Sequence, residues 1–189
     1  MSISIEISNL RLCSAFKDLA CDILSCIEVD NSSHVYIIDD TEHKYSCFIK
    51  SDEVVLDCFC GININNYNLH LLAIDNKLMT NIPGGIADCA LFNSDHFVLI
   101  EFKTNAEGNT QASVEYTYQK AIDQLKNTIK IFSARLKKVQ IDFYNHINIV
   151  PHIVVASKFP RSQAMEQNYA IQFANDTFLE LNFENSHEF

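Results

Sequence analysis

Two apolar segments, GGIADCALF at residues 84–92 and VLIEFKT at residues 98–104, are the most informative part of this chain for its fold. Both carry the hydrophobic residues typical of buried strands, and the polar turn Asn93-Ser94-Asp95 separates them. The pattern predicts strands over residues 87–92 and 97–103 that pair as a hairpin. Three charged side chains interrupt these otherwise apolar strands. Because burying an unpaired charged group is costly, each of them needs a physical reason.

The three charged residues are Asp88, Glu101 and Lys103. Successive side chains of a strand point to opposite faces, so Glu101 and Lys103 share one face, and the hairpin brings Asp88 close to both. Two carboxylates and one ammonium group then meet at one edge of the sheet. This grouping suits phosphodiester hydrolysis, because two hard oxygen ligands can hold Mg²⁺ or Mn²⁺ while a lysine orients the attacking water. The simpler alternative is an ordinary ion pair between Glu101 and Lys103 on a solvated face.

The segments on either side of the hairpin predict the rest of a sheet. Pro83-Gly84-Gly85 predicts a tight turn, since glycine tolerates a positive φ. Residues 69–74 before this turn and residues 150–156 after the hairpin have the composition of buried strands. Residues 111–138 predict a long helix, because their apolar side chains recur every three or four positions. The predicted fold class is α/β, with a mixed central sheet flanked by helices.

The N-terminal third predicts peripheral elements. A helix capped by Asn9 is predicted to run as far as Ile27, because its apolar residues form one stripe. Three short runs rich in strand-forming residues, at 34–38, 45–49 and 54–59, then predict an antiparallel meander.

A chain of 189 residues, 48% of them hydrophobic, can bury one sizeable core, and no linker or repeat divides it. We expect a single domain over residues 1–189 that closes with edge strands, or a small hairpin, at 170–173 and 178–183. No apolar run approaches the roughly 20 residues needed to cross a bilayer, so no membrane association is expected. Seven cysteines without a signal peptide favour a reducing cytoplasm. Cys58 and Cys60 have the spacing of a ligand pair, but a zinc site needs a second pair.

The net charge of −10 argues against a polyanionic partner, because affinity for nucleic acid comes largely from lysine and arginine. The charge is unevenly distributed, however. Residues 103–161 hold 9 basic and 4 acidic side chains, of 14 and 24 in the whole chain, so this segment is locally positive. Lys120, Lys126 and Lys130 on the predicted long helix are the candidates for contacts with nucleic-acid phosphates. Simple solvation of a helix face is the alternative for these lysines.

The stretch from Gly85 to Thr104 resembles the core of the PD-(D/E)XK, or restriction-endonuclease-like, nuclease superfamily. The resemblance rests on an Asp on one strand of a hairpin and Glu-x-Lys on the next, followed by a long helix and a buried strand. It covers a core of roughly residues 69–158. The sequence departs from the family pattern at Ala87, where many members have a Pro before the Asp.

This resemblance implies a role for each residue of the motif. Asp88 and Glu101 would bind Mg²⁺ or Mn²⁺, and the backbone carbonyl of Phe102 would be a third ligand. Lys103 would assist the attacking water.

The resemblance also suggests residues outside the motif. Several branches of the family carry a glutamine on the helix after Glu-x-Lys, for which Gln124 is the first candidate and Gln119 the second. Many members carry an acidic residue on the helix before the sheet, and this position is left open among three candidates: Asp18, Asp22 and Glu28.

The expected function is metal-dependent hydrolysis of nucleic acid, with DNA as the favoured substrate and a restriction, repair or phage-defence setting by resemblance alone. RNA, and endonuclease or exonuclease cleavage, stay open. A standalone nuclease of this size is expected to bind weakly, so a homodimer or a protein partner that supplies recognition is the natural remedy. The alternative keeps the fold without the chemistry: a catalytically inactive protein that docks a protein partner, which the acidic net charge favours.

Overall fold

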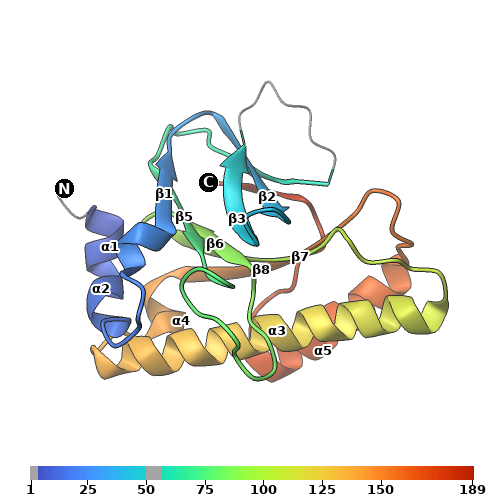
Figure 1. Cartoon of the computed structure of the whole chain (residues 1–189). Helices are drawn as coiled ribbons and strands as arrows, with labels where there is room; N and C mark the ends of the chain where they lie inside the picture. Colours follow the sequence, from blue (N-terminus) through green and yellow to red (C-terminus); the bar gives the residue numbers. More distant parts are fainter. Residues whose placement is uncertain (1–3, 50–56) are drawn as a thin grey trace.

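The chain folds into two mixed β-sheets flanked by helices, shown in a computed structural model that describes residues 4–49 and 57–189 (Figure 1). The central sheet contains β1 (Ile27–Asp30), β5 (Leu69–Ala73), β6 (Cys89–Phe92), β7 (His96–Lys103) and β8 (Asn148–Val155). The second sheet contains β2 (His34–Asp40), β3 (Tyr45–Ile49), β4 (Phe59–Ile62) and β9 (Ser186–Glu188). The helical elements are α1 (Ile5–Asn9), α2 (Leu12–Ala15), the 3-10 turn η1 (Ile23–Cys26), α3 (Gln111–Lys138), α4 (Phe143–His146) and α5 (Gln163–Thr177).

The central sheet has the strand order β1-β5-β6-β7-β8. Its first four strands are antiparallel neighbours, and β8 joins β7 in parallel after α3 has crossed one face of the sheet (Figure 1). The hairpin predicted over residues 87–92 and 97–103 is confirmed, because Cys89 pairs with Ile100 and the antiparallel register continues to the turn. The prediction of a mixed sheet flanked by helices is confirmed as well.

Both faces of the central sheet are buried. Alternate residues of β7 enter two different cores: Leu99 packs into the core that includes α3, and Ile100 packs into the core shared with the second sheet. Both side chains are 0% exposed. Burial on two faces explains why β7 is a nearly continuous apolar run, and it makes the charged residues near its end exceptional.

The long helix α3 covers the lower face of the sheet in Figure 1. Its start is set by a capping box, in which Thr110 and Ser113 each accept a hydrogen bond from the other's backbone N–H at 3.1 Å. The apolar stripe of the helix is buried as predicted, through Tyr118, Ile122, Leu125, Ile129, Phe132 and Leu136. No helix within the described ranges is long and apolar enough to span a bilayer.

The predicted meander is wrong in its strand order. β3 pairs with β2 on one side, but β4 returns to the other side of β2, and β9 then joins β4 in parallel. The order is therefore β3-β2-β4-β9, in a separate sheet that packs on the central one. Of the strand predicted over residues 54–59, positions 54–56 lie outside the described residues, and β4 begins at Phe59.

The long N-terminal helix predicted from Asn9 to Ile27 is also wrong. α1 ends at Asn9, where the helix was predicted to begin; within the predicted range lie the short helix α2 and the 3-10 turn η1, and Ile27 begins β1. Arg11, whose φ of 50° lies in the left-handed region, separates α1 from α2. The predicted stripe misled because its residues pack into or against one core without being in one helix: Leu12 lies in α2, Ile23 in η1 and Ile27 in β1.

The C-terminal strands predicted at 170–173 and 178–183 are wrong too. Residues 170–173 lie inside α5, which buries Phe173 and runs beside α3 (Figure 1). Residues 178–183 contribute an isolated bridge between Asn182 and His152. Short apolar runs do not distinguish a strand from one face of a helix, and here packing against α3 decides for the helix.

Candidate metal and catalytic site

Four of the residues selected from sequence meet at the edge where β7 ends. They are Asp88, Glu101, Lys103 and Gln124. Cys89, the first residue of β6, pairs with Ile100 of β7. Asp88 comes just before Cys89 and therefore lies beside Glu101, which follows Ile100. Gln124 reaches the same edge from α3, which packs on β7. The tertiary fold therefore brings the predicted residues together.

Asp88 is held in place by backbone contacts on two sides. Its Oδ2 accepts a hydrogen bond of 2.6 Å from the N–H of Phe102. Its own carbonyl accepts a hydrogen bond of 3.1 Å from the N–H of Asp75, in the loop that follows β5. Burial, reinforced by the negative charge of Asp39, raises the pKa of the Asp88 carboxyl to about 7.

Glu101 is a fully buried carboxyl group, with a side chain that is 0% exposed. One of its oxygens, Oε1, accepts a short hydrogen bond from the Lys103 ammonium, while Oε2 is buried without any hydrogen-bond partner. Burial, and then the charge of Asp88, raises the pKa of Glu101 well above its ordinary value. A buried carboxyl oxygen without a partner calls for a physical reason, and a bound cation would supply one.

Lys103 is fixed from two directions. Besides contacting Glu101, its Nζ donates a hydrogen bond of 2.9 Å to Oε1 of Gln124. The amide of Gln124 in turn donates from Nε2 to the carbonyl of Ile86 at 3.0 Å. Gln124 thus links the ammonium group to the segment that carries Asp88. The second candidate, Gln119, is exposed and bonds to Asp123 on the outer surface of α3, so it lies away from this site.

Two residues that sequence reasoning missed position the segment before Asp88. Thr128 of α3 accepts a hydrogen bond of 2.7 Å from the N–H of Ala87, and Asn127 donates from Nδ2 to the carbonyl of Gly85 at 2.7 Å. Both lie within one turn of Gln124 on the helix. That spacing was the available signal, since residues three and four apart share a helix face.

The turn at Gly84 and Gly85 gives a test of this positioning. Both glycines have positive φ, 85° and 73°. A Cβ on Gly85 would lie 2.8 Å from Cγ of Gln124, whereas the closest atom to a Cβ on Gly84 is 3.4 Å away. We expect Gly84→Ala to lower the free energy of unfolding by about 1–2 kcal/mol through backbone strain alone. Gly85→Ala should lower it by about 2–4 kcal/mol, because overpacking adds to the same strain.

Urea unfolding of the two variants measures this difference. Gly84→Ala is the matched control, since it shares the backbone conformation and lacks the contact with Gln124. Equal losses of stability in the two variants would contradict the assigned role of Gly85.

Two further carboxyl groups influence the site, those of Asp75 and Asp39, and sequence reasoning did not select either of them. Asp75 follows β5 at the same edge, and Asp39 lies near the end of β2 in the second sheet. Burial raises the pKa of both side chains, and the charge of Asp75 contributes to the shift of Asp39. Their charges also raise the pKa of Asp88. The signal that could have found Asp75 and Asp39 was their position, because each follows an apolar run near the end of a strand.

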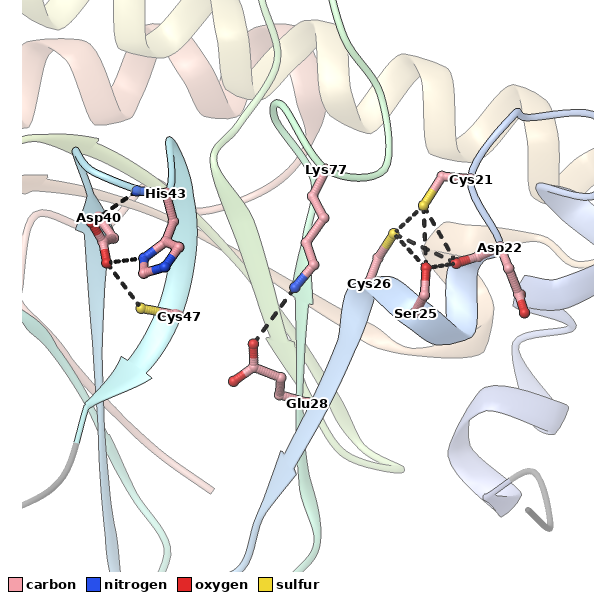
Figure 2. Close-up of polar contacts among 9 residues, drawn as sticks. All are labelled: Cys21, Asp22, Ser25, Cys26, Glu28, Asp40, His43, Cys47 and Lys77. Atoms are coloured by element: carbon pink, nitrogen blue, oxygen red, sulfur yellow. Dashed lines mark hydrogen bonds and ion pairs between the residues drawn. The ribbon is translucent and has the colours of Figure 1, made fainter.

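The three N-terminal acidic candidates make contacts elsewhere, and Figure 2 shows two of them, Asp22 and Glu28. Asp18 forms an ion pair with Arg135 at 2.6 Å between Oδ1 and Nη1. Oδ1 of Asp22 accepts a hydrogen bond from the N–H of Leu24 at 3.1 Å and caps η1. Glu28 lies 3.6 Å from the Nζ of Lys77. The additional carboxylates come from Asp75 and Asp39 instead.

The three candidate lysines of α3 project from different faces. At about 100° per residue, Lys120 lies roughly 40° around the helix from Gln124, whereas Lys126 and Lys130 lie roughly 160° and 120° away. Lys126 is engaged by Asp176 of α5 at 2.5 Å. Lys120 and Lys130 are exposed. Lys120 is therefore the candidate nearest to the face that carries the site.

Two features bear on whether the site could hold a divalent cation. Lys103 acts electrostatically on four carboxyl groups, those of Asp39, Asp75, Asp88 and Glu101, and Oε2 of Glu101 has no hydrogen-bond partner. The N–H of Phe102 points to Asp88, and the carbonyl of Phe102 points to the same side of β7. Phe102 lies past Ile100, where the pairing of β7 with β6 ends. Among residues 4–49 and 57–189, no three His, Cys, Asp or Glu side chains form a group that could hold a metal ion. The ligand set expected from the sequence is of another kind, because it combines the carboxylates of Asp88 and Glu101 with the backbone carbonyl of Phe102.

Cys58 and Cys60 are free and half-buried, and burial raises the pKa of both thiols.

No family model, curated protein or solved structure matches this chain. Function is therefore inferred from the geometry of the site.

Proposed function

We propose that this chain is a metal-dependent nuclease of the PD-(D/E)XK type, with a restriction-endonuclease-like core over roughly residues 69–158. The observation that carries the proposal is the arrangement of Glu101 and Lys103: a carboxyl group with one free oxygen, buried against an ammonium that Gln124 holds in place. The element order supports it, since three antiparallel strands are followed by a long helix and a strand parallel to the third.

The proposed ligand set is one carboxylate oxygen from each of Asp88 and Glu101 together with the carbonyl of Phe102. Mg²⁺ or Mn²⁺ bound there would neutralise charge on the phosphate and acidify a water. To bind the metal, the carboxyl groups of Asp88 and Glu101 would have to lose their protons. Without metal, the raised pKa of each group favours the protonated form. The hydrogen bond from Phe102 N–H keeps Asp88 oriented in this role.

Lys103 is proposed to position the attacking water and to stabilise negative charge on the phosphate. Its ammonium lies between Glu101 and Gln124, so its place is set before substrate arrives. The Lys103 side chain is only 14% exposed, so little solvent is present to screen the charge of its ammonium group. Gln124 is thus proposed to act as a positioning residue through Lys103.

The proposed substrate is nucleic acid, with DNA favoured. Its support is the excess of basic residues between positions 103 and 161 in an otherwise acidic chain. A small site of this kind is proposed to act as a homodimer or with a protein partner that supplies recognition.

The lysines of α3 make the substrate proposal testable. We expect Lys120→Ala to weaken binding to DNA oligonucleotides and to reduce the slope of log affinity against log salt by about 1, because one phosphate contact is lost. Lys130→Ala is the matched control, since this exposed lysine lies on another face of the helix. Fluorescence anisotropy over a salt series measures both, and equal slopes for the two variants would count against this orientation of the substrate.

The central experiment is digestion of plasmid and labelled single- and double-stranded DNA and RNA oligonucleotides with Mg²⁺ or Mn²⁺. We expect cleavage by the wild type, no cleavage with a chelator, and no cleavage by Asp88→Ala. Asp95→Ala is the control, because Asp95 is an exposed acid at the opposite end of the same hairpin. Cleavage that persists in Asp88→Ala would end the proposal.

Metal binding separates this function from the alternative of an inactive docking protein. Calorimetric titration with Mn²⁺ should give binding that Asp88→Ala removes and Asp95→Ala preserves. A wild-type protein that neither binds Mn²⁺ nor cleaves nucleic acid would favour the docking protein.

A further inference from the structure

Two cysteine side chains meet beside the first strand of the central sheet. Sγ of Cys21 and Sγ of Cys26 lie 3.0 Å apart, and both thiols are free (Figure 2). A disulfide bond is about 2.05 Å long, so the two sulfurs are about 1 Å from bonding distance. They come from one short segment, residues 21–26.

The local backbone brings this pair together. Asp22 caps the 3-10 turn η1, which ends at Cys26, so the two cysteines lie at the start and end of a single tight turn. Ser25 lies between the thiols: its Oγ donates to the carbonyl of Asp22 at 2.6 Å and is 3.3 Å from Sγ of Cys21. The carbonyl of Asp22 is also within 3.6 Å of each sulfur. The arrangement therefore fixes both thiols on one side of the turn.

The two thiols differ in access to solvent. Cys21 is half-buried and lines two surface cavities of about 360 and 310 Å³. Cys26 is 0% exposed, and burial together with its contact to Cys21 raises the pKa of its thiol to about 12. An oxidant from solvent can thus reach Cys21 first, while Cys26 stays reduced directly behind it.

We propose that Cys21 and Cys26 form a reversible dithiol–disulfide pair that responds to peroxide. The Cys21 thiolate attacks hydrogen peroxide, the O–O bond breaks, and a sulfenic acid and water are formed once the leaving hydroxide takes up the thiol proton. The sulfur of Cys26 then attacks the sulfenic sulfur, its proton leaves with the departing hydroxyl as a second water, and the S–S bond forms. Two thiols lose two electrons and two protons, and one peroxide is reduced to two waters. Disulfides of cytosolic proteins are commonly transient pairs of this kind.

Cys21 shares a cavity with a loop that leads away from the proposed metal site. The smaller cavity lined by Cys21 is also lined by Leu78 and Met79, from the loop that begins at Asp75. The N–H groups of Leu78 and Met79 both donate to the carbonyl of Ile74, so that loop is a compact turn. The proposal does not depend on nuclease activity.

The sequence provides a direct readout. Trypsin cleaves after Lys17 and Lys44, and the peptide between them contains Cys21 and Cys26 and no other cysteine. Folded protein is treated with equimolar hydrogen peroxide, quenched with catalase, unfolded and alkylated with iodoacetamide. We expect this peptide to be lighter by two hydrogen atoms than the reduced form and to carry no alkyl group. Reduction with dithiothreitol should restore two alkylation sites.

Three comparisons make the result decisive. Cys21→Ser should leave Cys26 fully alkylated, whereas Cys13→Ser, which changes another cysteine lining the larger cavity, should leave the disulfide intact. Wild-type protein unfolded in urea before peroxide is added should form far less of the link, because the fold no longer holds the thiols together. Two alkylated cysteines after treatment of the folded wild type, a sulfinic acid at Cys21 beside a free Cys26, or a link from Cys21 to Cys13 would each overturn the proposal.

Discussion

Lys103→Met is expected to reduce the rate of phosphodiester cleavage by about 10²- to 10⁴-fold while the protein still binds Mg²⁺. The loss follows from removing the group proposed to orient the water and stabilise the phosphate charge. Metal binding should persist or become tighter, because the ammonium that contacts Glu101 is also the cation that competes for the same carboxylates. Asp88→Asn should behave differently and lose binding and cleavage together.

Stability has to be measured alongside activity in this experiment. Lys103→Met leaves the buried Glu101 carboxyl without its hydrogen-bond donor, which costs about 1–3 kcal/mol, so the variant is expected to be less stable than the wild type without metal. Saturating Mg²⁺ should recover much of that loss by replacing the missing positive charge. Thermal unfolding with and without Mg²⁺ tests this, and Lys130→Met controls for the substitution itself on an exposed part of α3. Cleavage by Lys103→Met within about threefold of the wild type would exclude a catalytic role for Lys103.

Raising the pH through about 7 is expected to destabilise the metal-free protein and to strengthen its binding of Mg²⁺. In the folded state the pKa of Asp88 is raised from an ordinary value of 3.8 to about 7, and Glu101 is shifted in the same direction. The folded protein therefore keeps protons that the unfolded chain releases. This contribution to stability is fully present at pH values below the ordinary pKa and is lost as the pH rises through about 7.

Metal binding has the opposite dependence on pH, because the ligands must be deprotonated before they bind. One coupled proton changes the apparent affinity about tenfold per pH unit below the pKa. Calorimetry between about pH 6 and pH 8 measures the affinity, and thermal unfolding of the metal-free protein over the same range measures stability. Asp88→Asn should flatten both profiles, while Asp95→Asn should leave them unchanged. An affinity for Mg²⁺ that is independent of pH would show that Asp88 is not a ligand.

The hairpin was predictable because its evidence is local. The alternation of Glu101 and Lys103 around Phe102 fixes which side chains share a face, and the apolar run fixes the strand. Gln124 was a first choice on a well-defined helix, and its hydrogen bond to Lys103 agrees with that choice. The N-terminal helix failed for the opposite reason: its apolar spacing was real, but the left-handed turn at Arg11 lies outside what periodicity reports.

The hairpin, the long helix α3, the buried strand β8 and the three charged residues of the motif were all predictable from local patterns, because strand alternation and helical periodicity are properties of neighbouring residues. The three-dimensional packing was needed to show that Asp75 and Asp39 act on Asp88, that Asp18, Asp22 and Glu28 make contacts elsewhere, and that Cys21 meets Cys26. The physical reason is that charge and sulfur contacts depend on distance through space. Those distances are set by how two sheets and their helices pack, which no local pattern encodes.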